Sequence, residues 1–198
     1  MKSENSYLVW AHPRSDSLTA QVVEEIQGQA AINGIKMKTL DLYRSNFDPV
    51  LNVEDEPDWG NPQKQYSSEV HRLFDDVENA DTLFLVFPVW WFSIPAILKG
   101  YLDRVMNHGL AYGEGKSLAA TKVRWIALVG GSEERFLRHG HDKHMTSFMN
   151  ESMGYLGIKD SQVTFLYNTL GVEEDIGDST QHFKQLFRQA RDVVDALN

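Results

Sequence analysis

The segment from residue 81 to residue 106 constrains the fold of this chain more than any other. It starts with an apolar run over residues 82–87, passes through an aromatic turn over residues 88–95, and continues with apolar residues at the spacing of one helix face. A run that is apolar at nearly every position is typical of a central parallel strand covered on both faces. The segment therefore predicts a buried strand, a loop and a helix, with Ser93 as the helix cap and Pro95 in the first turn.

Apolar runs and helical periodicity divide the rest of the chain into similar elements. Further strands are expected over residues 7–11, 35–42, 123–129 and 162–167. One amphipathic helix is expected after each strand. The fourth of these helices is predicted to bury Met145, Phe148, Met149, Tyr155 and Leu156.

Two irregular segments are predicted between these elements. Residues 133–143 are expected to form a charged loop. Residues 44–65 are polar, contain three prolines and carry the acidic run Glu54-Asp55-Glu56. A connection of this length in a compact domain is usually functional or part of an interface, so we expect one of those two roles.

The alternation of strands and helices predicts one α/β domain over residues 1–198. Right-handed crossovers would build a parallel sheet between two layers of helices, which is a three-layer sandwich. The flavodoxin-like strand order 2-1-3-4-5 is the natural arrangement for a five-stranded parallel sheet of this kind.

Composition argues against several classes of function. The sequence has no cysteine, which excludes disulfides, cysteine nucleophiles and iron–sulfur clusters. Its formal net charge is −9 at pH 7, with no basic stripe, so nucleic acid is not an expected partner. The first residues do not resemble a signal peptide, and no apolar run approaches the roughly 20 residues needed to span a bilayer. We therefore expect a cytoplasmic protein without membrane insertion.

The predicted strand order brings three loops to one edge of the sheet. These loops cover residues 11–19, 87–94 and 128–132, after the first, third and fourth strands. In open α/β sheets, ligands bind at the carboxyl ends of the strands where the strand order reverses. We therefore expect the three loops to form one crevice.

Each of the first two loops has a functional and an ordinary interpretation. The first loop is rich in Ser, Thr and Asp before a helix and can hold an anion, although N-capping by Asp16 or Ser17 explains the same pattern. The second loop contains Trp90, Trp91 and Phe92, which suit a planar ligand. An aromatic cluster of this kind can also be a core plug or a subunit contact.

A phosphorylated planar heterocycle satisfies all three loops, because the glycines of the third loop let a ring edge approach the backbone. Flavin mononucleotide (FMN) is the simplest such molecule, and FAD is the alternative. No Gly-x-Gly-x-x-Gly motif follows the first strand, which disfavours a Rossmann dinucleotide site.

Four motifs carry a resemblance to a known family. They are Ala11-His12-Pro13 followed by Ser17, Phe87-Pro88-x-Trp-Trp-Phe-Ser-Ile-Pro-Ala-x-Leu-Lys-Gly, Gly109-x-Ala111-Tyr112-Gly113, and Gly130-Gly131. They resemble the flavodoxin-like NAD(P)H:quinone oxidoreductases, which include DT-diaphorase and the ancillary subunits of bacterial glutathione-gated potassium efflux systems. The similarity is densest over residues 81–112 and thin beyond residue 155.

The resemblance implies a flavin in the crevice and NADH or NADPH as the electron donor. It implies that His12 and the turn at residues 17–19 hold the flavin phosphate and ribityl chain. It also implies a homodimer in which Tyr112 borders the substrate pocket, from either subunit. The cofactor-binding residues expected on this basis are His12, Ser17, Leu18, Thr19, Pro88, Val89, Trp90, Trp91, Phe92, Leu128, Val129, Gly130, Gly131 and Phe136.

The chain departs from the DT-diaphorase pattern in the same pocket. Leu128 and Val129 replace two threonines, which removes hydroxyl groups from one edge of the flavin. Phe136 replaces a tyrosine, and His141 lies within about one residue of the family histidine. We therefore expect His141 and Tyr112 to be the catalytic residues, with His141 as a proton donor and water as the alternative donor.

A metal site is not predicted. His139, His141 and His144 lie close together in the sequence, but no acidic ligand motif accompanies them. A solvated loop is the simpler interpretation for His139 and His144.

These observations predict a flavoprotein that takes a hydride from NADH or NADPH and passes two electrons to a quinone or similar acceptor by a ping-pong mechanism. The alternative is a regulatory flavoprotein subunit docked on a membrane transporter such as a potassium efflux system. An electron-transfer flavodoxin is a third option, which the aromatic pocket and Tyr112 disfavour.

Overall fold

A five-stranded sheet forms the centre of the computed structural model, which describes residues 4–61, 63–119, 121–172 and 176–197. The strands pair in the order β2-β1-β3-β4-β5, and every pair is parallel. The predicted flavodoxin-like order is therefore confirmed. The strands are β1 (Asn5–Trp10), β2 (Lys36–Asp41), β3 (Thr82–Pro88), β4 (Lys122–Leu128) and β5 (Asp160–Leu166).

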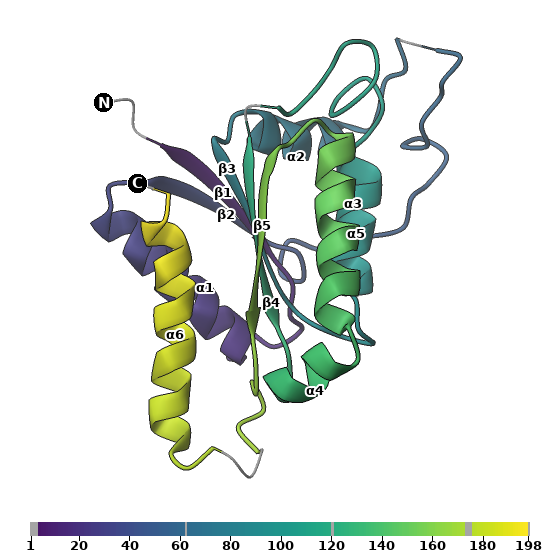
Figure 1. The fold of residues 1–198 in the computed structure, drawn as a ribbon. Helices are drawn as coiled ribbons and strands as arrows, with labels where there is room; N and C mark the ends of the chain where they lie inside the picture. The colour runs from purple at the N-terminus through teal and green to yellow at the C-terminus, as the bar shows by residue number, and fades with distance from the viewer. Residues whose placement is uncertain (1–3, 62, 120, 173–175, 198) are drawn as a thin grey trace.

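Helices cover both faces of this sheet (Figure 1). One face carries α1 (Leu18–Ile32) and α6 (Ser179–Asp195). The other face carries α2 (Ser68–Glu78), α3 (Ala96–Val105) and α5 (His141–Tyr155). No helix within the described ranges is long and apolar enough to cross a membrane.

The central strand β3 joins the two apolar cores. Successive side chains of a strand point to opposite faces, so Phe84 and Val86 belong to the core beneath α1 and α6, whereas Leu83 and Leu85 belong to the core beneath α3 and α5. All seven positions of β3 are buried. This confirms the expectation of a strand that is covered on both faces.

The structure corrects the predicted charged loop over residues 133–143. These residues form the short helix α4 (Glu133–Arg138), the joint at Gly140 and the first turn of α5. The hydroxyl of Ser132 accepts a hydrogen bond from the amide of Arg135 and caps α4, and acidic residues occupy the first turn, where the helix dipole favours them. The prediction was wrong because it counted charges and overlooked this capping pattern, so the described chain has six helices.

Two expectations about helix ends and faces were also wrong. Ser93 does not cap α3: its backbone pairs with Trp90 in a turn, and Pro95 occupies the N-cap position. Tyr155 is 66% exposed, and the fully buried face of α5 is formed by Met145, Met149 and Met153 instead.

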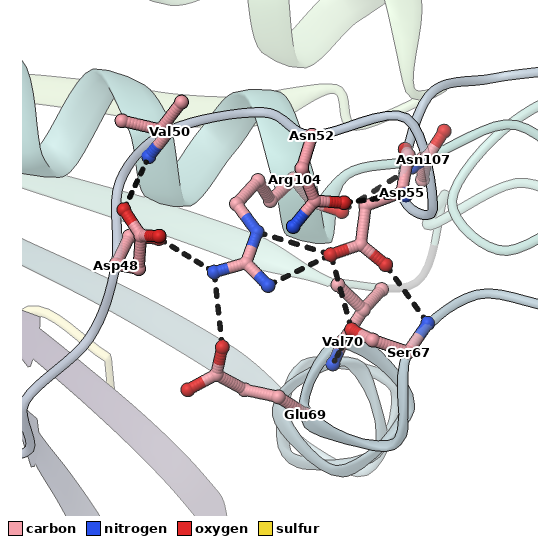
Figure 2. A network of polar contacts seen from close by, with 9 residues as sticks. All are labelled: Asp48, Val50, Asn52, Asp55, Ser67, Glu69, Val70, Arg104 and Asn107. Atoms are coloured by element: carbon pink, nitrogen blue, oxygen red, sulfur yellow. Dashed lines mark hydrogen bonds and ion pairs between the residues drawn. The ribbon is translucent and has the colours of Figure 1, made fainter.

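A buried ion pair ties the long connection before α2 to helix α3 (Figure 2). The guanidinium of Arg104 donates hydrogen bonds to Asp55, 2.7 Å from Nη2 to Oδ2, and to the carbonyl oxygen of Asp48. Glu69 of α2 lies 2.9 Å from the same guanidinium. The Arg104 side chain is 4% exposed and the Asp55 side chain is fully buried. This network attaches the connection, for which the sequence predicts a functional or interface role, to helices α2 and α3.

Hydrogen bonds determine the ionisation of Asp55. Burial alone would raise the pKa of this carboxyl group, but hydrogen bonds from Ser67 and Arg104 outweigh burial, and the pKa lies below its ordinary value. Because the folded-state pKa is below the unfolded value, the stabilisation is fully present above about pH 4 and is lost as pH falls through the folded-state pKa.

Removal of Arg104 should destabilise the protein far more than removal of an exposed cation from the same helix. Arg104→Met leaves Asp55 buried without a counter-charge, so the free energy of unfolding should fall by about 3–5 kcal/mol at pH 7. Lys99→Met removes an exposed pair with Asp103 and should cost less than about 1 kcal/mol. Urea denaturation of both variants measures the difference. Equal decreases in the free energy of unfolding would show that the buried Arg104–Asp55 pair contributes no more to stability than the exposed pair does.

Candidate active site

The aromatic turn after β3 has an unusual backbone. The amide of Trp90 donates to the carbonyl of Ser93 and the amide of Ser93 donates back to Trp90, each at 3.1 Å. Trp91 and Phe92, between them, have φ values of 50° and 57°. Positive φ at both central positions is typical of a type I′ turn, which glycine and asparagine normally occupy. Bulky aromatic residues in this conformation are strained, and such strain often marks a functional site.

A cavity of about 540 Å³ lies beside this turn. One wall consists of Val89, Trp91 and Phe92, and a second wall consists of residues 129–132, just after β4. Helices α4 and α5 complete it with the side chains of Arg135, Phe136, His139 and His141. The second and third loops of the predicted crevice therefore meet at one cavity.

His141 lies inside an aromatic cluster at this cavity. Its imidazole stacks on Phe92, with ring centroids 4.0 Å apart and planes 19° apart. Phe136 lies 5.4 Å away and His139 5.7 Å away. The expected neighbours Phe136 and His141 thus do lie together, and His141 is partly buried rather than in a solvated loop.

Tyr167, just after β5, extends this cluster and was missed by the sequence analysis. Its ring lies 5.8 Å from Phe136. Burial, with smaller contributions from Glu133 and Asp142, raises the pKa of Tyr167 to about 12. The phenol therefore remains a hydrogen-bond donor throughout the neutral range. No sequence pattern points to this residue. Its neighbours Phe136 and Glu133 lie on α4, and the sequence analysis predicted that helix to be a loop.

Gly131 of the third loop keeps the cavity wall open, whereas a Cβ atom on Gly130 would lie 3.3 Å from the side chain of Leu170. Nothing lies within 4 Å of the position that a Cβ atom would take on Gly131. The amide groups of Gly130 and Gly131 pair with no acceptor in the part of the chain that the structure describes. The carbonyl oxygen of Gly131, in contrast, accepts from the amide of Asn168 at 2.9 Å. The wall is thus fixed in place while it retains two donors for a ligand.

The first loop stands apart from this cavity. Neither His12 nor residues 17–19 line it, and the one ring contact toward it joins His12 to Trp90, with centroids 6.0 Å apart. Ser17 caps α1 by accepting from the amide of Ala20, so the ordinary interpretation of this residue is confirmed. The amides of Leu18 and Thr19 are in the first turn, where no intrahelical acceptor exists.

The local hydrogen bonds define the state of His12. Partial burial is the main reason that the pKa of His12 lies below its ordinary value. The amide of Arg14 donates to Nδ1 at 3.1 Å, so in the neutral imidazole the proton is on Nε2. His12 can therefore donate one hydrogen bond from Nε2.

Arg44 braces the first loop and was also missed by the sequence analysis. It donates to the backbone carbonyls of Pro13 and His12 and lies 4.8 Å above the ring of Trp10. A single arginine beyond a strand carries no motif, so only the folded chain shows this role.

Tyr112 does not reach the main cavity. It lines a separate cavity of about 320 Å³ between α3 and α5, together with Leu102, Phe148 and Tyr155. Its ring lies 5.1 Å from Tyr155 and 5.8 Å from Trp59. Burial, and then the neighbouring Tyr155, raises the pKa of Tyr112. Pro88 and Leu128 pair with each other at the ends of β3 and β4, and Trp90 lies in the aromatic turn; none of these three expected site residues lines the main cavity.

Among the residues with defined positions, no group of three or more His, Asp or Glu side chains is placed to hold a metal ion.

Comparison with known proteins gives a consistent result. The family model described as "Flavodoxin-like fold" matches residues 4–190. An uncharacterized NAD(P)H oxidoreductase of Escherichia coli (strain K12), YcaK, is 52% identical over the full length of both chains. Ribosyldihydronicotinamide dehydrogenase [quinone] of Pongo abelii is 34% identical, over 71% of this chain and 69% of its own.

A solved structure shares the fold at lower sequence identity. An FMN-dependent NADH-azoreductase of Bacillus anthracis, in complex with FMN, superposes with a TM-score of 0.69. The superposition covers 98% of this chain and 99% of that one, at 18% identity.

The strain at Trp91 predicts an unusual order of stability for two variants. Trp91 is 95% exposed, so neither Trp91→Gly nor Trp91→Ala removes much buried area. Of the two replacements, only glycine adopts a positive φ without strain. The free energy of unfolding of Trp91→Gly should therefore be about 1 kcal/mol higher than that of Trp91→Ala. Denaturation of the two purified variants without added ligand measures the order. The same pair of changes at Trp59, which is 64% exposed and lacks a positive φ, should not favour glycine. Equal stability of Trp91→Ala and Trp91→Gly would contradict the inference that the backbone at position 91 is strained.

Proposed function

The chain belongs to the flavodoxin-like NAD(P)H oxidoreductases, and from this membership we propose that it binds FMN and transfers two electrons from NADH or NADPH to a quinone or similar acceptor. The observation that carries the proposal is the cavity at the carboxyl ends of β3 and β4. It combines an aromatic wall, a glycine wall and a partly buried histidine.

The first loop fits the phosphate end of such a cofactor. The free first-turn amides of Leu18 and Thr19 are donors at the positive end of a helix dipole. The hydroxyl proton of Ser17 and the Nε2 proton of His12 can add further hydrogen bonds. Arg44 fixes the loop from behind.

The main cavity fits the planar ring. Trp91 and Phe92 supply flat apolar surface, and the amides of Gly130 and Gly131 supply donors for polar atoms at a ring edge. The solved azoreductase of the same fold holds FMN. When bound, a flavin would supply the hydride chemistry that no amino-acid side chain can provide.

The residues of the chain would then position substrates and deliver a proton. A quinone takes up protons when it is reduced, and histidine is the side chain that most often donates protons in enzymes, so His141 at the cavity is the proposed donor. Stacking on Phe92 holds its imidazole in place. Phe136 has no exchangeable proton and cannot take part in the proton transfer. Its apolar ring would limit the access of water to the cavity.

The separate cavity beside Tyr112, between α3 and α5, favours the proposed homodimer. It is lined by Leu102, Phe148 and the exposed Tyr155, and exposed aromatic surface of this kind suits a protein partner. A second copy bound over this separate cavity would explain why Tyr112 lies away from the main cavity of its own chain. The alternative of a regulatory subunit on a membrane transporter receives no support from the three proteins named above.

If both substrates use the main cavity, they must bind in turn. Initial rates measured against NADPH at several fixed quinone concentrations should give parallel double-reciprocal lines. Intersecting lines with several acceptors would mean that both substrates bind together, and the shared cavity would be incorrect.

Loss of His141 should slow turnover while the cofactor stays bound. His141→Ala removes the proposed proton donor and should lower kcat by about 10²-fold or more, with loss of the pH dependence near neutrality. His144→Ala changes an exposed residue of the same helix that does not line the cavity, and it should behave as wild type. A wild-type rate and pH profile in His141→Ala would identify water as the donor.

A further inference from the structure

The main cavity of this negatively charged protein is lined by one arginine and, among the described residues, by no acidic side chain. Its chargeable side chains are Arg135, His139 and His141, and no acidic side chain is among the described residues that line it. The whole chain carries a formal net charge of −9 at pH 7. A positive pocket on such a surface selects for an anionic ligand.

Arg135 is the permanently charged member of this lining. Across the described ranges, its guanidinium group has no hydrogen-bond or ion-pair partner. Glu134, beside it in sequence, is paired with Arg138 at 2.7 Å, one turn further along α4. Helix α4 therefore carries two arginines: Arg138 is paired with Glu134 and does not line the cavity, and Arg135 at the cavity wall has no partner among the residues that the structure places.

The backbone of α4 keeps Arg135 at this wall. Its amide donates to the hydroxyl of Ser132, which also lines the cavity, and Phe136 next to it is buried against the core. An unpaired guanidinium on a capped helix beside a ligand cavity is well suited to a phosphate, which accepts two parallel hydrogen bonds from it.

We propose that Arg135 recognises a phosphate group of the nicotinamide nucleotide donor and thereby selects phosphorylated donors over the unphosphorylated riboside. The inference rests on the proposed function, because it assigns a residue to the donor of that reaction. The flavin phosphate is not the anion in question, since the first loop proposed to hold it lies outside the cavity that Arg135 lines.

The test compares three variants with a graded series of donors. Arg135→Gln removes the charge, Arg135→Lys keeps it without the planar fork, and Arg138→Gln is the matched control on the same helix. The donors are NADPH, NADH and dihydronicotinamide riboside, which has no phosphate. Steady-state kinetics give KM and kcat for each, and calorimetry gives the Kd of NADP⁺ and NAD⁺ for the flavin-loaded protein.

Arg135→Gln should raise KM for NADPH and Kd for NADP⁺ by about tenfold or more, the size expected for loss of a charge-assisted contact to phosphate at a partly open site. The kcat should not change, KM for the riboside should stay the same, and Arg138→Gln should match wild type. A rise for NADPH alone assigns the 2′-phosphate, and an equal rise for NADH assigns the pyrophosphate. Either result supports the proposal, and Arg135→Lys should give an intermediate value.

Three results would overturn it. Unchanged KM and Kd in Arg135→Gln would show that no donor phosphate reaches this residue. An equal rise in KM for the riboside would show a general disturbance of the pocket. Loss of FMN from Arg135→Gln would show that the guanidinium serves the flavin. A wild-type protein that oxidises none of the donors would overturn the proposed function itself, which separates that failure from a failure at Arg135 alone.

Discussion

Burial of β3 on both faces is the constraint on which the rest of the structure depends. With all seven positions inside the protein, the strand must have a neighbour on each side, and β1 and β4 take those places. The loops after these strands then emerge at the same edge of the sheet. The cavity follows from this arrangement, because the aromatic turn after β3 and the glycines after β4 are held a strand spacing apart.

The same rigidity supports a turn that would not form in isolation. Two aromatic residues with positive φ cost roughly 1–2 kcal/mol each. Trp91 is 95% exposed and gains almost no burial to offset this, while Phe92 is still 52% exposed. The fold retains exposed aromatic rings at the mouth of a cavity in spite of that cost. A bound planar ligand would cover these rings and restore the missing contacts, which makes the turn more consistent with ligand binding than with a core plug.

Sequence reasoning was most successful where one local pattern determines one element. The run over residues 82–87 and the periodic faces of α1, α2 and α6 led directly to the strand order and to two of the three converging loops. It was less successful where the structure depends on contacts between distant residues. Arg44 and Tyr167 contact residues that are remote in sequence, and Arg135 lies on a helix that the sequence analysis predicted to be a loop. The hydroxyl cap of Ser132 turns a charged segment into a helix, and neither charge nor hydrophobicity reveals it.

The central claim is that one cofactor spans two separate parts of this edge, with its phosphate at the first loop and its ring in the main cavity. A fluorescence titration of flavin-free protein with FMN and with riboflavin tests it most directly, because the two ligands differ only in the phosphate. We expect one equivalent of FMN to bind, and riboflavin to bind at least about tenfold more weakly, since it forgoes the charge-assisted hydrogen bonds at the first loop. Equal affinity for the two ligands, or no binding of either, would contradict the account.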